Sequence, residues 1–163
     1  LGHLDVKPSN VILRPEPGTV GSPGTSVLVD FGLAGRQLRP GCATANYGAP
    51  EIWENQASIE TPTPQGADVY ALGCMIYEVL TRRTLFDGPN PMALIHAHFR
   101  HDGSPPEVAS LLEDPSMKPL GTLIQSTLRR RSADRIDISR VRLSLNSLLP
   151  RYAEDSWPLS IPA

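Results

Sequence analysis

The chain has 163 residues, a net charge of −2 and only two cysteines. This length suits one domain that buries a sizeable core, and the small charge gives no reason to expect a nucleic-acid or membrane surface. Cys42 and Cys74 are far apart and in no metal-binding spacing, which favours free thiols in a reducing compartment such as the cytoplasm. No apolar run is long enough to span a bilayer, and no signal-peptide pattern opens the chain.

The first predicted feature is a polar loop over residues 3–10, followed by a short buried strand over residues 11–13. Pro8 fixes its own φ and biases the preceding residue away from helix, so the loop should be rigid. A carboxylate can accept a proton, a lysine can neutralise a moving phosphoryl group, and an amide oxygen can ligate a hard cation. The loop carries one side chain of each kind: Asp5, Lys7 and Asn10.

These eight residues, His-Leu-Asp-Val-Lys-Pro-Ser-Asn, resemble the catalytic loop of the protein kinases, whose pattern is H-R-D-L-x-x-x-N. The chain departs from that pattern at Leu4, where the family has Arg, and at Val6, where it has Leu. Further kinase landmarks follow in the family order. They are Asp30-Phe31-Gly32, Ala49-Pro50-Glu51, Asp68-Val69-Tyr70-Ala71-Leu72-Gly73 and Arg135.

The resemblance implies an α+β fold that is mainly α, the large C-terminal lobe of a kinase, over residues 1–150, with a tail over 151–163. A Pro-, Gly- and Ser-rich loop precedes a second apolar strand at residues 27–29, which would pair with the first strand as a hairpin. By resemblance, Asn10 and Asp30 would then hold the Mg²⁺ ions that bridge the phosphates of ATP. Ile12 would form the apolar floor under the adenine, or simply part of the core.

The next segment, residues 33–42, resembles a short activation loop and contains no Ser, Thr or Tyr. Many kinases have an Arg before the catalytic Asp that receives a phosphate from this loop, and here Leu4 takes its place. Residues 43–51 resemble the substrate-binding segment G-T-x-x-Y-x-A-P-E. Ala43 replaces the Gly, and Ala does not accept a positive φ as Gly does. Thr44 matches the Thr whose hydroxyl bridges the catalytic Asp and Lys in Ser/Thr kinases.

After a polar loop over residues 54–66, an apolar pattern predicts a helix over residues 68–81 that is buried on most sides. Asp68 should cap this helix and also accept hydrogen bonds from the catalytic loop. By resemblance, Glu51 and Arg135 should form an ion pair. Leu111-Leu112 and residues 120–128 together predict one more amphipathic helix, and an apolar period predicts another over residues 138–149, ended by Pro150.

A short helix is also predicted over residues 91–100. It carries His96 and His98, and His101 follows it. Residues two and five apart do not share a helix face, so a solvated surface helix is favoured over a metal site.

The sequence therefore predicts a protein Ser/Thr kinase, of bacterial character, that transfers the γ-phosphoryl group of ATP to hydroxyls of protein substrates, with Asp5, Lys7, Asn10 and Thr44 as the catalytic residues. No Gly-rich loop or V-A-I-K lysine occurs in the chain, so the lobe that covers ATP is expected upstream. The alternative is a truncated or pseudokinase-like interaction module without activity. A metal-dependent phosphohydrolase built on Asp5 and Asp30 would need further ligands that the sequence does not offer.

Overall fold

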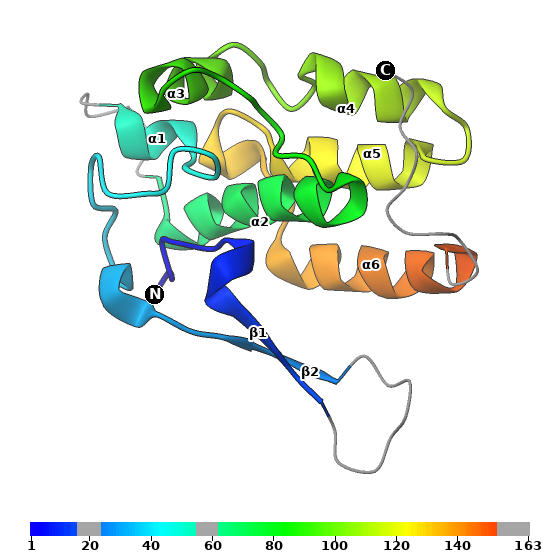
Figure 1. The fold of residues 1–163 in the computed structure, drawn as a ribbon, viewed down its shortest axis with the longest axis horizontal. Coiled ribbons are helices and arrows are strands. Elements are labelled where there is room, and N and C mark those ends of the chain that lie inside the picture. The colour runs from blue at the N-terminus through cyan, green and yellow to red at the C-terminus, as the bar shows by residue number, and fades with distance from the viewer. Residues whose placement is uncertain (16–23, 55–61, 153–163) are drawn as a thin grey trace.

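The computed structural model describes residues 1–15, 24–54 and 62–152. In this part of the chain, six α-helices accompany one antiparallel hairpin, as Figure 1 shows. The elements are β1 (Val11–Arg14), β2 (Thr25–Leu28), α1 (Pro50–Trp53), α2 (Pro64–Thr81), α3 (Pro91–Phe99), α4 (Pro106–Glu113), α5 (Lys118–Thr127) and α6 (Ile138–Tyr152). The expected mainly α-helical α+β fold is confirmed.

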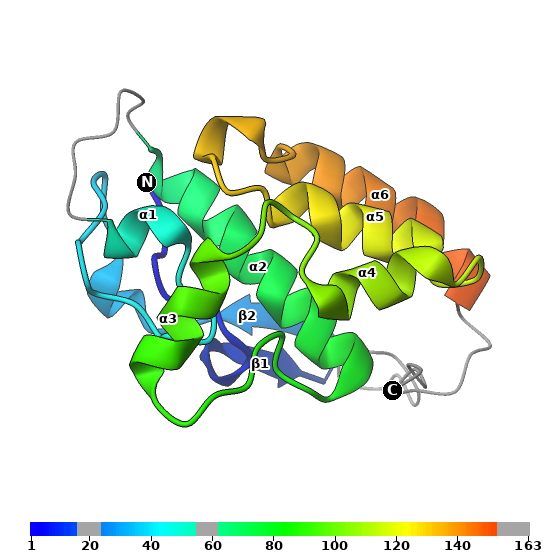
Figure 2. The same ribbon diagram turned by 90° about the horizontal axis from the view of Figure 1, so that it is seen from above.

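Helix α2 lies at the centre of the helical layer, with α5 beside it and α4 and α6 packed on α5 (Figures 1 and 2). Tyr70 and Cys74 on α2 are fully buried. A Cβ at Gly73 would clash with the Thr127 hydroxyl oxygen, so glycine permits the close approach of α2 and α5. None of the helices in the described residues is long and apolar enough to cross a membrane.

The start of α2 differs from the prediction. The helix begins at Pro64, and the Thr63 side chain caps it by accepting a hydrogen bond from the backbone N–H of Gly66. Proline is tolerated in this first turn because its missing N–H would have no partner in the helix. Asp68 therefore lies inside the helix, and its expected role as the cap is wrong.

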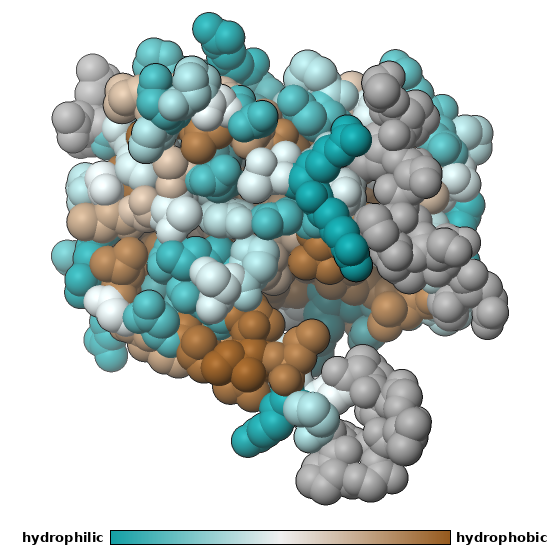
Figure 3. All heavy atoms as spheres, in the orientation of Figure 1, coloured by the Kyte–Doolittle hydropathy of each residue, from teal (hydrophilic) through white to brown (hydrophobic). Residues whose placement is uncertain are grey.

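The hairpin forms as expected, with Val11 opposite Leu28. Its second strand begins at Thr25, two residues before the predicted start. The prediction that the first strand is buried is wrong, because Ile12 and Leu13 are 53% and 67% exposed. A two-stranded sheet has no second layer unless another element covers it. Apolar side chains gather on the surface in the region of the hairpin in Figure 3.

The C-terminal helices also differ from the prediction. Two helices, α4 and α5, stand where one was expected, and a turn around Asp114, which accepts from the N–H of Ser116, separates them. Helix α6 continues past Pro150 to the buried residue Tyr152, whose hydroxyl donates to the carbonyl of Ser116 at 2.6 Å. Residues 153–163, most of the predicted tail, lie outside the described residues, so the boundary at residue 150 stays a prediction.

Candidate active site

The backbone of the catalytic loop is anchored from α2. The Asp68 carboxylate accepts hydrogen bonds from the N–H groups of His3 and Leu4, both at 2.7 Å, as the sequence predicted. Leu4 has a φ of 67°, a left-handed conformation that costs a non-glycine residue about 1–3 kcal/mol. Two hydrogen bonds to one half-buried carboxylate, together with burial of the leucine side chain, hold the loop in this shape.

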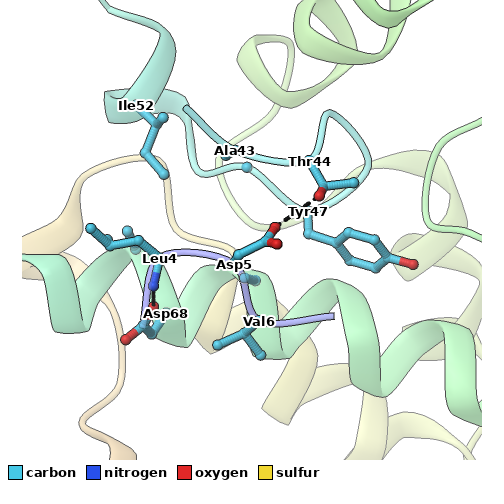
Figure 4. Close-up of a pocket in the computed structure, with 11 residues that line it drawn as sticks. Leu4, Asp5, Val6, Ala43, Thr44, Tyr47, Ile52 and Asp68 are labelled. Atoms are coloured by element: carbon cyan, nitrogen blue, oxygen red, sulfur yellow. Dashed lines mark hydrogen bonds between the residues drawn. The ribbon is translucent and has the colours of Figure 1, made fainter. Parts of the chain in front are cut away.

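The Leu4 side chain is 4% exposed and lines a small pocket that Ile52 and Ala43 also line (Figure 4). This is the position at which many kinases have the phosphate-receiving Arg. Here it is filled by an apolar side chain. The segment that resembles the activation loop is tied to the start of the catalytic loop by a backbone bridge between Gly2 and Gly35.

Asp5, Lys7 and Thr44 form a closed triangle of hydrogen bonds. The Thr44 hydroxyl donates to Asp5 Oδ1 at 2.8 Å, and Lys7 Nζ lies 2.9 Å from Thr44 Oγ1 and 2.7 Å from Asp5 Oδ2. The first of these bonds is drawn in Figure 4. The structure thus brings together three predicted catalytic residues that lie up to 39 positions apart.

The triangle keeps the carboxylate ionised. Burial by itself would raise the pKa of Asp5, but hydrogen bonds from Lys7 and Thr44 outweigh it and hold that pKa below its ordinary value. A lysine ammonium has three N–H donors, and these contacts use two of them. The third remains to meet an anionic group that enters the site.

Asn10, the fourth predicted catalytic residue, is held in one orientation. Its side-chain nitrogen donates to the Asp5 carbonyl at 2.9 Å and to Asp5 Oδ2 at 3.2 Å. Those two bonds occupy the amide donors and leave the amide oxygen for another partner. The Asn10 carbonyl also accepts from the N–H of Val29, the residue before Asp30, at 2.9 Å.

Asp30 has a φ of 64° and accepts from the N–H of Gly32 through Oδ1 at 3.3 Å, which leaves Oδ2 outside that contact. His3 supports this corner, since its Nε2 is 2.9 Å from the Val29 carbonyl and its ring meets Phe31 edge-on. An amide oxygen and a carboxylate oxygen on adjoining segments fit the ligand preference of Mg²⁺. Ile12 lies on the exposed side of the hairpin, so it forms no part of the core of the described residues.

The substrate-binding segment contains a backbone turn in which the Thr44 carbonyl accepts from the N–H groups of Tyr47 and Gly48. Ala43 adopts no positive φ, and Gly41 provides the left-handed residue of this region, at φ 72°. Trp53 on α1 donates its indole N–H to the Gly48 carbonyl at 3.1 Å. The tight turn therefore survives the replacement of glycine at position 43.

The predicted ion pair between Glu51 and Arg135 is confirmed. The guanidinium is bidentate on the carboxylate, at 2.6 and 2.7 Å, and its side chain is 1% exposed. It also lies over the Tyr70 ring, 4.9 Å from the ring centre. The pair ties α1, which begins at the end of the substrate-binding segment, to the chain between α5 and α6.

The prediction of a solvated surface helix at residues 91–100 is wrong for His98, which is fully buried and bonded through both ring nitrogens. Sequence reasoning missed this residue because its partners, Ala45 and Tyr70, lie 53 and 28 positions away. The described residues contain no group of three His, Cys, Asp or Glu side chains arranged to hold a metal.

Comparison with known proteins gives a family match and several relatives. The protein kinase domain family matches residues 1–144. Serine/threonine-protein kinase PkaB of Streptomyces coelicolor is 33% identical over 160 residues, which is 93% of this chain and 35% of that protein. Serine/threonine-protein kinase PknB of Mycolicibacterium smegmatis is 33% identical over 168 residues, or 99% of this chain and 26% of that protein.

Serine/threonine-protein kinase PkaA of Streptomyces coelicolor is 32% identical over 140 residues, covering 82% of this chain and 23% of that protein. The chain thus spans between about a quarter and about a third of the length of these relatives. Their bacterial origin agrees with the bacterial character that the sequence indicated. The chain therefore belongs to the protein kinase domain family and corresponds to its large, C-terminal lobe.

Proposed function

We propose that this chain supplies the catalytic half of a protein Ser/Thr kinase, which transfers the γ-phosphoryl group of ATP to protein hydroxyls. The observation that supports this most strongly is the triangle of Asp5, Lys7 and Thr44. A lobe that had lost its chemistry would have no need to keep a carboxylate, an ammonium and a hydroxyl within hydrogen-bond distance of one another.

Asp5 orients the substrate hydroxyl and accepts its proton as the phosphorus–oxygen bond forms. Because the pKa of Asp5 is held below its ordinary value, it acts mainly by orienting the hydroxyl, and it takes the proton late. Lys7 neutralises charge on the transferred group with its remaining N–H. Thr44 holds Asp5 and Lys7 in place and seats the substrate backbone next to them.

Mg²⁺ bound with ATP would offset the negative charge that builds up on the phosphoryl oxygens during transfer. The residues that would hold it are Asn10 and Asp30, through the oxygens that their hydrogen bonds leave uncommitted. Ile12, exposed on β1, would contact the adenine from the side of this lobe.

The proposed partners are ATP and proteins that present a serine or threonine hydroxyl. The proposed location is the cytoplasm, which supplies ATP and keeps thiols such as Cys42 and Cys74 reduced; both are free in the structure.

The test is phosphoryl transfer from γ-labelled ATP by the full-length protein, with casein as the acceptor. Asp5→Asn should lower kcat by at least about 10²-fold, because the neutral amide cannot take the proton. Asp134→Asn, at an exposed carboxylate paired to Arg131 at 3.7 Å, is the matched control and should keep the parent rate. Labelled phosphoserine or phosphothreonine is the expected product. A parent protein that binds ATP without turnover would favour the interaction module instead.

A further inference from the structure

A continuous chain of hydrogen bonds runs from His101, through Tyr70 and His98, to the substrate-binding segment. The Tyr70 hydroxyl lies 2.8 Å from His98 Nδ1 and 3.1 Å from His101 Nε2. His98 Nε2 lies 2.9 Å from the Ala45 carbonyl, and the Gly103 N–H donates to His101 Nδ1 at 3.0 Å. These hydrogen bonds thus connect α3 and the residues after it to α2 and to the segment that contains Thr44.

The hydrogen-bond partners at the two ends determine which nitrogen of each imidazole carries a proton. A carbonyl only accepts, so His98 Nε2 carries a proton and its Nδ1 must accept from the Tyr70 hydroxyl. At the other end, the N–H of Gly103 requires His101 Nδ1 to be an acceptor, so His101 Nε2 donates to the tyrosine oxygen. Each group then makes one complementary set of bonds, with both imidazoles neutral.

The surroundings favour this neutral state. Tyr70 and His98 are fully buried, and Phe86 packs edge-on against the His98 ring at 4.8 Å between ring centres. Burial lowers the pKa of His98 and of His101 to about 4 in each case. At neutral pH the direction of every hydrogen bond is therefore constant, and His98 always presents a donor to the Ala45 carbonyl.

Ala45 is the residue after Thr44, whose hydroxyl bonds to Asp5 and whose carbonyl closes the turn at Tyr47 and Gly48. We propose that His98 is a positioning residue for substrate binding. Its Nε2–H donates to the Ala45 carbonyl and thereby holds the backbone turn at Thr44 in place, so that the Thr44 hydroxyl stays within hydrogen-bond distance of Asp5. This inference rests on the proposed kinase function for its effect on substrate, but the positioning itself can be measured without activity.

Two substitutions of His98 separate the effect of losing the hydrogen bond to Ala45 from the effect of replacing the imidazole ring. The amide group of glutamine can reach the place of Nε2, so His98→Gln keeps a donor for Ala45. The amide of the shorter asparagine reaches only the place of Nδ1, so His98→Asn keeps an acceptor for Tyr70 and loses the donor. His96, exposed on the same helix, provides the control variant His96→Asn.

The first readout is hydrogen exchange of the Tyr47 and Gly48 amides in the full-length protein. We expect exchange at these two amides to be about tenfold faster in His98→Asn, the factor that matches loss of one hydrogen bond, and to stay near the parent value in His98→Gln. Tyr70→Phe, which removes the hydroxyl that fixes the His98 tautomer, should produce a smaller change in the same direction.

The second readout is steady-state phosphorylation of casein. The KM for casein should rise about tenfold in His98→Asn and recover in His98→Gln, while the KM for ATP stays within about twofold of the parent. The proposal would be overturned if amide exchange and the KM for casein were unchanged in both His98→Asn and Tyr70→Phe. It would also be overturned if exchange became faster across all helices and not specifically at the Tyr47 and Gly48 amides. A parent protein with no transfer activity would contradict the proposed kinase function alone, since the exchange measurement would still decide the positioning role.

Discussion

Replacement of Arg135 by alanine should destabilise the fold severely. The guanidinium has five N–H donors, and all five are used. Two go to Glu51, and the others go to the carbonyls of Gly66, Arg129 and Arg130 at 2.7–2.9 Å. The substitution leaves a buried carboxylate and three carbonyls without these donors.

Loss of one partner from a buried ion pair costs about 3–5 kcal/mol, and unsatisfied carbonyls raise this toward the upper end. With a urea m-value of about 2 kcal/mol/M for a domain of this size, the unfolding midpoint should fall by about 1.5–2.5 M. Arg135→Lys keeps the charge but not the planar fork, so it should lie between alanine and the parent.

Urea unfolding followed by tryptophan fluorescence measures this loss. Trp53 is on α1, two residues after Glu51, and Trp157→Phe introduced in every variant leaves Trp53 as the one tryptophan of these 163 residues. Arg130→Ala is the matched control. Its ion pair with Glu54 is 3.5 Å long and its side chain is 51% exposed, so it should cost less than about 1 kcal/mol. An Arg135→Ala midpoint equal to that of Arg130→Ala would refute the reasoning.

Three further predictions concern the site and the buried histidines. Asp30→Ala should abolish Mg²⁺-dependent transfer in the full-length protein while its circular dichroism and unfolding midpoint stay near the parent values; an active variant would remove Asp30 from the site. Asp68→Asn should lower both stability and kcat, because an amide N–H₂ would face a backbone N–H of the catalytic loop; rates and unfolding midpoint equal to the parent would contradict this. Burial depresses the pKa of His98 and His101 from 6.5 to about 4, so the unfolded chain binds more protons below pH 6.5. The free energy of unfolding should therefore decrease between about pH 6.5 and pH 4, with a smaller slope in His101→Gln; equal slopes would exclude this contribution.

One more prediction follows from the exposed side of the hairpin. The 163-residue chain alone should bind ATP and Mg²⁺ weakly and should tend to associate, because Ile12, Leu13 and Phe31 are more than half exposed. Calorimetric titration beside the full-length protein tests this. Micromolar binding with turnover by the short chain would show that this lobe suffices.

The sequence by itself determined the features that depend on near neighbours and on family pattern. Asp5, Lys7 and Asn10 share one loop because they are near neighbours in the sequence, and Pro8 makes that loop rigid. The apolar period of α2 predicted its burial. The pairing of Glu51 with Arg135 came from the resemblance, since no local signal joins residues 84 positions apart. The proposed roles of the site residues stay predictions.

Tertiary structure alone decided which side chains meet across long stretches of sequence. A histidine on a short helix carries no mark of burial, and His98 became a buried donor only because Tyr70 and Ala45 come to either side of it. In the same way, Asp68 bonds to the catalytic loop instead of capping α2, because the helix begins earlier, at Pro64. The apolar pattern of β1 predicted burial, yet burial depends on a covering layer, which the periodicity of a single strand does not specify.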